Sequence, residues 1–237
     1  MPLIPLNRAL CDCNHCEHRS LRMFCNLDDK ALAEFNALGT HSQALSGATL
    51  FEEETPVGNV YVVCHGRVKL FSTSRQGKTL ILKIALPGDV LGLGAVMSGS
   101  DYEVTAETIE PTQLKIIPLD DFLKFIHKYG EASVHAAQAL SAEYRTAFFD
   151  ARRLALSVSS ASRLASLLLE WGRAAGHDKP DMRFTMALTH EDLANLIGTS
   201  RETVTRMLSK FKRDKLIQMR GATIVILAPD KLELMAA

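Results

Sequence analysis

The sequence lacks an excess of either charge, and it lacks long apolar runs. It has 27 basic and 27 acidic residues among 237, so its formal net charge is zero. No apolar run approaches the ~20 residues of a membrane span, and residues 1–8 lack the apolar stretch of a signal peptide. These absences exclude a highly charged disordered chain and a membrane-spanning protein. They predict a cytoplasmic protein of one large or two modest domains.

The sequence also lacks the short motifs of common enzyme classes. It contains no Gly-rich phosphate loop, no G-x-S-x-G and no H-E-x-x-H. These are the patterns of nucleotide-phosphate binding, acyl transfer and zinc-dependent hydrolysis. We therefore expect a protein that is not an enzyme.

Cysteine is scarce, and four of the five cysteines lie together in the first tenth of the chain. They are Cys11, Cys13, Cys16 and Cys25, whereas Cys64 stands alone. In a cytosolic protein, such clustering indicates metal, cluster or redox chemistry before structural disulfides. The spacing alone leaves metal ligation, a thiol–disulfide switch and inert thiols open.

The first half of the chain predicts an antiparallel β-roll. After a helical pattern over 27–38, short β-rich runs follow, and glycines recur between them at equal intervals of eleven residues. Short strands with a turn signal every ~8–12 residues favour an antiparallel sandwich or barrel over a parallel sheet. The expected strands lie at 48–51, 59–63, 67–71, 79–85 and 112–117.

The pattern becomes helical again after Pro118. We expect a short helix over 119–128, a long one over 131–157 and a third over 161–175. The long helix carries a narrow stripe of small and apolar residues that suits a partner helix, and hence a homodimer. Packing of the stripe against the chain's own β-roll is the alternative. The stripe consists of Val134, Ala137, Ser141, Tyr144, Phe148 and Ala151.

Residues 188–216 predict a helix-turn-helix. Thr189 caps a first helix with acids in its first turn, and Gly198 ends it. Ser200 caps a second helix that buries an apolar stripe. Two short helices around a Gly-containing turn form this motif. Residues 217–227 then predict a hairpin, the wing of a winged helix-turn-helix.

The second helix carries the residue types that read base edges. Arg201, Glu202 and Arg206 occupy its N-terminal end, away from the apolar stripe. Arginine grips guanine O6 and N7 bidentately, and a carboxylate accepts from cytosine N4. Residues 201–220 hold seven basic and two acidic residues, which indicates a phosphate-facing surface that includes Lys210 and Lys212.

The chain resembles a bacterial family of transcription regulators, typified by the cyclic-AMP receptor protein and the fumarate–nitrate regulator. The resemblance covers about residues 20–230, and GDVLG (88–92) and SRETVTR (200–206) carry it most specifically. It implies an α+β fold, double-stranded DNA and RNA polymerase as partners, and a palindrome close to TGTGA–N₆–TCACA. By position it implies base reading by Arg201, Glu202 and Arg206. It also implies phosphate contacts from Thr189, Ser200 and Thr203.

Cyclic nucleotide is an improbable effector for this sequence. Relatives that bind it follow GDxxG with a Glu for the ribose and an Arg-Ser pair for the phosphate. Here Leu93 takes the place of the Glu, and the Arg-Ser region reads Asp101-Tyr102-Glu103-Val104. A buried phosphate beside carboxylates and without a cation would face repulsion and a desolvation cost.

The N-terminal cysteines place the chain nearer the fumarate–nitrate branch. The segment HCEHRSLRMFCNL resembles the oxygen-sensing members, which implies an iron–sulfur cluster, written here as [4Fe–4S]. Such members take a further cysteine from the strand before the dimer helix, where this chain has Lys115. Its cluster would therefore use Cys11, Cys13, Cys16 and Cys25, with Cys64 or a carboxylate as other candidates. Zinc near His15 and His18, a dithiol switch, and haem on His41 or His65 stay open.

Together these patterns predict four segments. They are a cysteine-rich segment (1–27), a sensory β-roll (28–129), a dimerisation helix (130–157) and a winged helix-turn-helix (158–237). A different class of function, a β-roll module that regulates a partner protein, would explain the first half alone. The helix-turn-helix argues against that alternative, because such a module does not need a DNA-reading helix.

Overall fold

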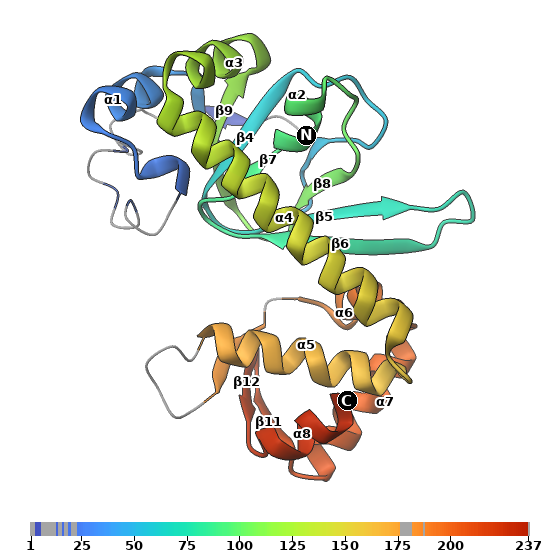
Figure 1. The fold of residues 1–237 in the computed structure, drawn as a ribbon. Coiled ribbons are helices and arrows are strands. Elements are labelled where there is room, and N and C mark those ends of the chain that lie inside the picture. The colour runs from blue at the N-terminus through green and yellow to red at the C-terminus, as the bar shows by residue number, and fades with distance from the viewer. Residues whose placement is uncertain are drawn as a thin grey trace. The chain divides into compact units, whose positions relative to one another are not determined.

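The structure is a computed structural model that describes residues 3–5, 13, 16, 19, 23–175, 182–186 and 188–236. Two compact units make up the chain, Met1–Ala147 and Phe148–Ala237. The boundary between them falls within the long helix α4 (Gly130–Leu156), labelled in Figure 1. In the described part of the chain, no helix is long and apolar enough to cross a membrane.

The first unit contains two antiparallel sheets, as the sequence predicts for a β-roll. The five-stranded sheet has the order β1-β2-β9-β4-β7, and the four-stranded sheet has the order β3-β8-β5-β6. The strands are β1 (Ile4–Pro5), β2 (Thr40–Ala44), β3 (Thr49–Phe51), β4 (Asn59–His65), β5 (Val68–Thr73), β6 (Thr79–Ala85), β7 (Val90–Leu91), β8 (Thr105–Thr108) and β9 (Thr112–Pro118).

Strand β4 shows how one sheet serves two cores. Its residues 60–63 are all buried, because β4 lies between β9 and β7 and has neighbours on both faces. Val60 and Val62 pack into a core formed with the helices. Tyr61 and Val63 point the other way, into a core between the two sheets. The alternation of side chains along a strand produces this division.

Helices of the first unit cover the five-stranded sheet. They are a short 3₁₀ turn η4 (Met23–Cys25), α1 (Asp29–Ala37), α2 (Leu93–Ser98), α3 (Leu119–Lys128) and the first part of α4. Phe24, Phe35, Phe122 and Phe125 stack near one another in the core, with ring centroids 5.4–6.5 Å apart. Burial of each such ring contributes about 1.5–3 kcal/mol. This aromatic cluster therefore anchors the residues around Cys25 to the helices.

The second unit is a winged helix-turn-helix, as the sequence predicts. Its buried side chains include Leu164 and Leu168 of α5 and Leu193, Leu208 and Phe211 of the two motif helices, all at most 2% exposed. A three-stranded antiparallel sheet of order β10-β12-β11 completes the unit. The elements are α5 (Ser160–Ala175), β10 (Arg183–Thr185), α6 (His190–Ile197), α7 (Arg201–Arg213), β11 (Ile217–Arg220), β12 (Thr223–Ile226) and α8 (Pro229–Ala236).

Candidate nucleic-acid interface and effector cavity

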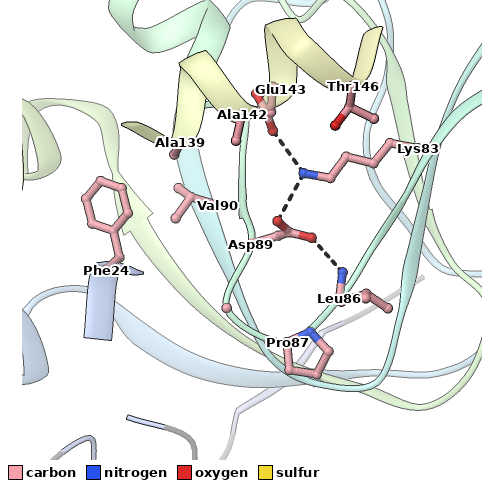
Figure 2. A pocket seen from close by; sticks show the side chains of 11 residues that line it. Phe24, Lys83, Leu86, Pro87, Asp89, Val90, Ala139, Ala142, Glu143 and Thr146 are labelled. Atoms are coloured by element: carbon pink, nitrogen blue, oxygen red, sulfur yellow. Dashed lines mark hydrogen bonds and ion pairs between the residues drawn. The ribbon is translucent and has the colours of Figure 1, made fainter. Parts of the chain in front are cut away.

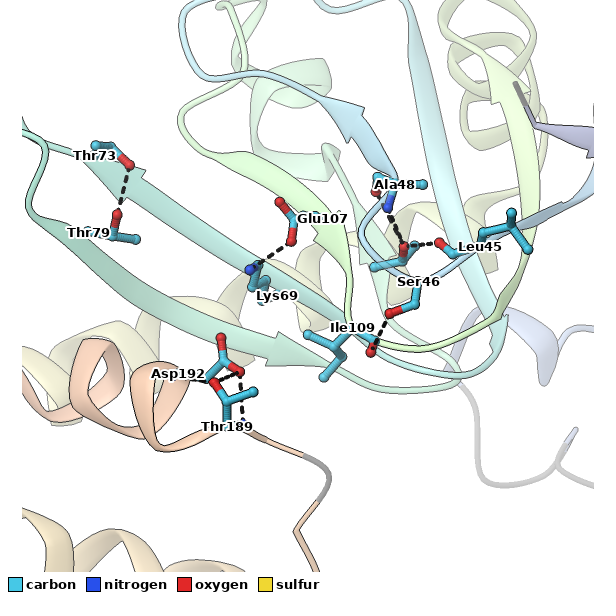
Figure 3. A network of polar contacts seen from close by, with 11 residues as sticks. Leu45, Ser46, Ala48, Lys69, Thr73, Thr79, Glu107, Ile109, Thr189 and Asp192 are labelled. Carbon is cyan, nitrogen blue, oxygen red and sulfur yellow. Dashed lines mark hydrogen bonds and ion pairs between the residues drawn. The ribbon is translucent and has the colours of Figure 1, made fainter. Parts of the chain in front are cut away.

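Two capped helices and a glycine turn build the helix-turn-helix. The Thr189 side chain accepts from Asp192 N at 3.0 Å, and the Asp192 carboxylate accepts from Thr189 N at 3.0 Å (Figure 3). This reciprocal capping box starts α6. Gly198 ends α6 with φ 63°, a backbone conformation that glycine adopts without strain. Ser200 then accepts from Thr203 N at 3.3 Å and starts α7.

The recognition helix α7 exposes the side chains that the sequence assigns to base reading. Arg201, Glu202 and Arg206 are exposed and lie within its first two turns. The opposite face is apolar and fixes the helix against its own unit. That buried face consists of Val204, Met207, Leu208 and Phe211. The packing therefore presents the N-terminal end of α7, which is the end that enters a major groove in such motifs.

Glu202 is held in its ionised form. Its own backbone amide, the Ser200 hydroxyl and the neighbouring Arg201 lower the pKa of the Glu202 carboxyl below its ordinary value. The cause is the free N–H groups at a helix N-terminus, which favour negative charge. An ionised carboxylate is an acceptor only, so Glu202 matches a donor such as the cytosine amino group.

The residues assigned to phosphate contact lie around the same helix end. Thr189 and Ser200 are the exposed caps of α6 and α7, and Thr203 is half-buried with its Oγ1 3.1 Å from Ser200 Oγ. Lys210 and Lys212 are exposed in the last turn of α7. The caps thus flank the N-terminal end of α7, and the lysines lie at its other end.

One contact between the motif helices was absent from the sequence analysis. His190 Nδ1 lies 2.8 Å from Thr205 Oγ1, and this contact joins the first residue of α6 to the exposed side of α7. The two residues are 15 positions apart, so no local sequence pattern predicts their contact. Only the angle between the two helices brings them together.

The apolar stripe of α4 lies in solvent. Val134, Tyr144 and Phe148 are 55%, 73% and 57% exposed. Ala137, Ser141 and Ala151 are exposed too. Ala132 and Ala136, on another side of the helix, are fully buried and pack into the core of the first unit. The stripe residues therefore do not provide this packing, and the alternative that they cover the β-roll is not what the structure shows.

A cavity of about 380 Å³ lies between the β-roll and α4. Leu93 and the segment Tyr102–Val104, which the sequence analysis compared with the ribose and phosphate positions of relatives, line it together. Phe51 and Tyr102 stack in its wall with ring centroids 4.0 Å apart. The cavity wall is mainly apolar, as in many small-molecule sites.

A second cavity of about 380 Å³ adjoins Lys83 (Figure 2). Lys83 Nζ bonds Asp89 Oδ1 at 3.0 Å and Glu143 Oε1 at 3.2 Å, and so ties β6 to α4. Burial lowers the pKa of Lys83, but the carboxylates of Asp89 and Glu143 outweigh burial and hold that pKa above its ordinary value. No local sequence pattern predicts this link, because Lys83 and Glu143 are 60 positions apart.

A cyclic nucleotide does not fit the donor set of the first cavity. Among the described residues that line it, Lys83 is the one cation, and two carboxylates already hold its ammonium. Glu103 also lines this cavity and adds a carboxylate to its wall. A phosphodiester there would meet a carboxylate without a matching cation.

The cysteine segment is described only in part. Cys13 and Cys25 are 8% and 5% exposed, Cys16 is half-buried, and Cys11 lies outside the described residues. Cys13 N donates to Asn36 Oδ1 at 3.3 Å, which connects the segment to α1. Over the described ranges, no group of three or more His, Cys, Asp or Glu side chains could hold a metal ion. The structure therefore does not bring the three described cysteines of the segment, Cys13, Cys16 and Cys25, together as a set of metal ligands.

The histidines considered for haem lie apart from both cavities. His41 is buried in β2, where its pairing partner across the ladder is Lys115. His65 is exposed at the end of β4. Neither lines either of the two cavities.

Comparison with known proteins supports the fold of each of the two units. A model of the Crp-like helix-turn-helix domain matches residues 162–235, and a model of the cyclic nucleotide-binding domain matches residues 43–129. The transcriptional activator protein anr of Pseudomonas aeruginosa is 27% identical over 232 residues, which cover 94% of this chain and 91% of that protein. The nitrogen fixation regulation protein FixK of Bradyrhizobium diazoefficiens is 27% identical and covers 95% of this chain and 94% of its own length.

Solved structures show the same fold. FixK2 from Bradyrhizobium japonicum superposes with a TM-score of 0.75 at 23% identity, over 84% of this chain and 98% of that one. The c-di-GMP responsive regulator CLP of Xanthomonas campestris gives 0.72 at 22% identity, over 84% and 99%. With a β-roll, a long helix and a Crp-like helix-turn-helix in one chain, this protein belongs to the CRP/FNR family of transcription regulators.

Proposed function

We propose that this regulator binds, as a homodimer, a DNA palindrome close to TGTGA–N₆–TCACA. The observation that carries the proposal is the exposed set of Arg201, Glu202 and Arg206 at the N-terminal end of a recognition helix with a buried opposite face. Two arginines match the two guanines of each half-site, and the ionised Glu202 matches a cytosine on the other strand. Thr189, Ser200, Thr203, Lys210 and Lys212 would contact phosphates and set the register.

The palindrome requires two copies of α7. A twofold dimer would place them one helical turn of DNA apart, about 34 Å. The exposed stripe of α4, with three large apolar side chains more than half exposed, offers the surface for that dimer. The named relatives anr and FixK are an activator and a regulatory protein. RNA polymerase is accordingly the proposed protein partner.

Binding to labelled duplexes tests the proposal directly. We expect the protein to bind the palindrome about 10³-fold or more tightly than a scrambled duplex of the same length, with affinity for both falling steeply as salt increases. Fluorescence anisotropy across a salt series measures both quantities. Equal affinity for the two duplexes at every salt concentration would refute sequence-specific recognition.

For the sensory unit, we propose an effector other than a cyclic nucleotide. The mainly apolar cavity lined by Leu93 and Glu103 supports this, since Lys83 is the one cation among its described lining residues and is already engaged by Asp89 and Glu143. The cysteine segment is the other candidate for sensing. We propose Cys11, Cys13, Cys16 and Cys25 as ligands of an iron–sulfur cluster, supported by their number and spacing.

Replacement of Cys16 tests the cluster. Protein purified without oxygen should contain iron and sulfide, and Cys16→Ser should lose most of both, because Cys16 lies inside every plausible ligand set of the segment. Elemental analysis and an absorption spectrum measure this. Cys64→Ser, which changes a half-buried thiol in β4, tests the other thiol candidate for the fourth ligand: it should keep its metal, because Cys11 is the proposed fourth ligand, and loss of metal in this variant would assign that place to Cys64. Full metal content in Cys16→Ser would exclude these ligands, and zinc without sulfide would point to a zinc site.

A further inference from the structure

The contact between His190 and Thr205 lies at the end of α7 that carries the base-reading residues. Thr205 is exposed and stands between Arg201 and Arg206 in the sequence of the helix. His190 is half-buried and is the first residue of α6. Their side chains approach to 2.8 Å. This polar contact holds the exposed face of α7, which the buried apolar face of the helix does not hold in place.

The proton count fixes the direction of this hydrogen bond. Thr205 Oγ1 lies 2.9 Å from the Arg201 carbonyl oxygen and donates to it. A hydroxyl has one proton, so the same oxygen must accept from His190, and Nδ1 of the imidazole carries the hydrogen. The result is a chain of two bonds from His190 through Thr205 to the backbone of Arg201. That backbone belongs to one of the two arginines assigned to base reading.

The bond is not needed to form either helix. The capping box of Thr189 and Asp192 starts α6, and Ser200 starts α7. Helices α6 and α7 pack against each other, and Leu193, Ile197 and Leu208 on these helices are fully or almost fully buried. Such apolar packing is non-directional, so it restrains rotation of α7 about its axis less sharply than a hydrogen bond does. A directional bond at the exposed N-terminal end restrains that rotation.

We infer that His190 is a positioning residue for DNA recognition, acting through Thr205 to fix the first turns of α7. The inference rests on the proposed function, because it assigns His190 an effect on base reading. A change in the position of the base-reading side chains changes the affinity of the protein for the palindrome. It leaves the sequence-independent attraction to phosphates largely unchanged.

A double-mutant cycle tests this inference. His190→Ala and Thr205→Val should each weaken binding to the palindrome by about threefold to tenfold, the size of one net hydrogen bond. The double variant should lose no more than either single variant, because both remove the same bond. Affinity for the scrambled duplex should stay within about twofold of wild type, since a bond within the protein contributes nothing to phosphate attraction. His190→Asn, whose amide nitrogen can donate from a position near Nδ1, should recover most of the affinity.

The outcomes separate this inference from the proposed function. If wild type prefers the palindrome but the two single losses multiply in the double variant, the inference is wrong and the proposed function stands. If His190→Ala weakens both duplexes alike, His190 contacts phosphate or supports folding, and the positioning role is again wrong. If wild type does not prefer the palindrome, the proposed function fails and the inference fails with it. Thermal unfolding of each variant should match wild type within a few degrees, because the caps and the buried core are unchanged.

Discussion

Arg206→Ala should weaken binding to the TGTGA palindrome by about 1–3 kcal/mol, or about 5- to 150-fold, and should relax the preference at one base pair of each half-site. Arg206 is exposed on α7 and makes no contribution to the buried face of that helix. The loss would therefore come from DNA contacts and not from unfolding. A guanidinium presents a rigid pair of donors that matches guanine O6 and N7, and alanine presents none.

The measurement compares four duplexes that differ only at the base pair assigned to Arg206. Wild type should separate them clearly, whereas Arg206→Ala should bind all four with similar affinity. Arg206→Lys is a sharper variant, because it keeps the charge but loses the bidentate geometry. It should retain affinity for scrambled DNA and lose discrimination.

Lys212→Ala is the matched control for Arg206→Ala. Lys212 is exposed in the last turn of α7, and it carries one positive charge like Arg206. Because Lys212→Ala loses a phosphate contact, its affinity for the palindrome and for scrambled DNA should fall by the same factor. The magnitude of the slope of log K against log salt concentration should decrease by about 0.9. Equal losses on both duplexes for Arg206→Ala would show that Arg206 contacts phosphate and does not read a base.

Local signals allowed much of the second unit to be predicted from sequence. The caps Thr189 and Ser200 and the turn at Gly198 act within one helical turn, so their effect is visible in neighbouring residues. The wing was equally local: β11 and β12 turn at Gly221, whose φ is 57°. Strand β10 and helix α8 were not predicted from the sequence, because both are short and depend on tertiary contacts. Strand β10 forms by pairing with β12, and α8 packs on α5.

The first unit shows where local signals end. Strand β2 (THSQA) lacks an apolar alternation, yet His41 and Ser42 are buried in it. Its place is set by pairing with the distant strand β9, and His41 lies opposite the buried Lys115. A buried polar residue depends on partners that only the folded sheet supplies. The ion pair between Lys83 and Glu143 could not be predicted for the same reason, because its partners come together only in the folded unit.

The residues of the candidate site likewise fall into two groups: those that local sequence patterns predict and those that depend on the tertiary structure. Arg201, Glu202 and Arg206 followed from helical periodicity, because their exposure depends on residues of the same helix. The family resemblance aligned Leu93 and Glu103 with the ribose and phosphate positions of relatives, and the structure places both residues in the lining of one cavity. The contact of His190 with Thr205 required the angle between two helices, which the sequence does not state.

Phe148→Arg should convert the protein to a monomer and remove tight binding to the palindrome in the same step. Phe148 is 57% exposed on α4, and Val134 and Tyr144 on the same stripe are 55% and 73% exposed. Large apolar side chains grouped on one helix face mark a surface that another chain covers. An arginine there would be buried without a partner in a dimer, which costs several kcal/mol at each of two symmetric positions. The monomer would contact one half-site only.

Sedimentation equilibrium and anisotropy on the same samples test this prediction. Phe148→Leu is the matched control: it keeps an apolar side chain and should stay dimeric with near wild-type affinity. Because Phe148 is exposed in the chain, Phe148→Arg should remain folded, with a thermal transition close to that of wild type. Its affinity for the palindrome should fall to that for a duplex with a single half-site, since half-sites bound one at a time lose the gain from linkage. A dimeric Phe148→Arg would place the dimer surface elsewhere, and a monomeric wild type with tight palindrome binding would overturn the requirement for two copies of α7.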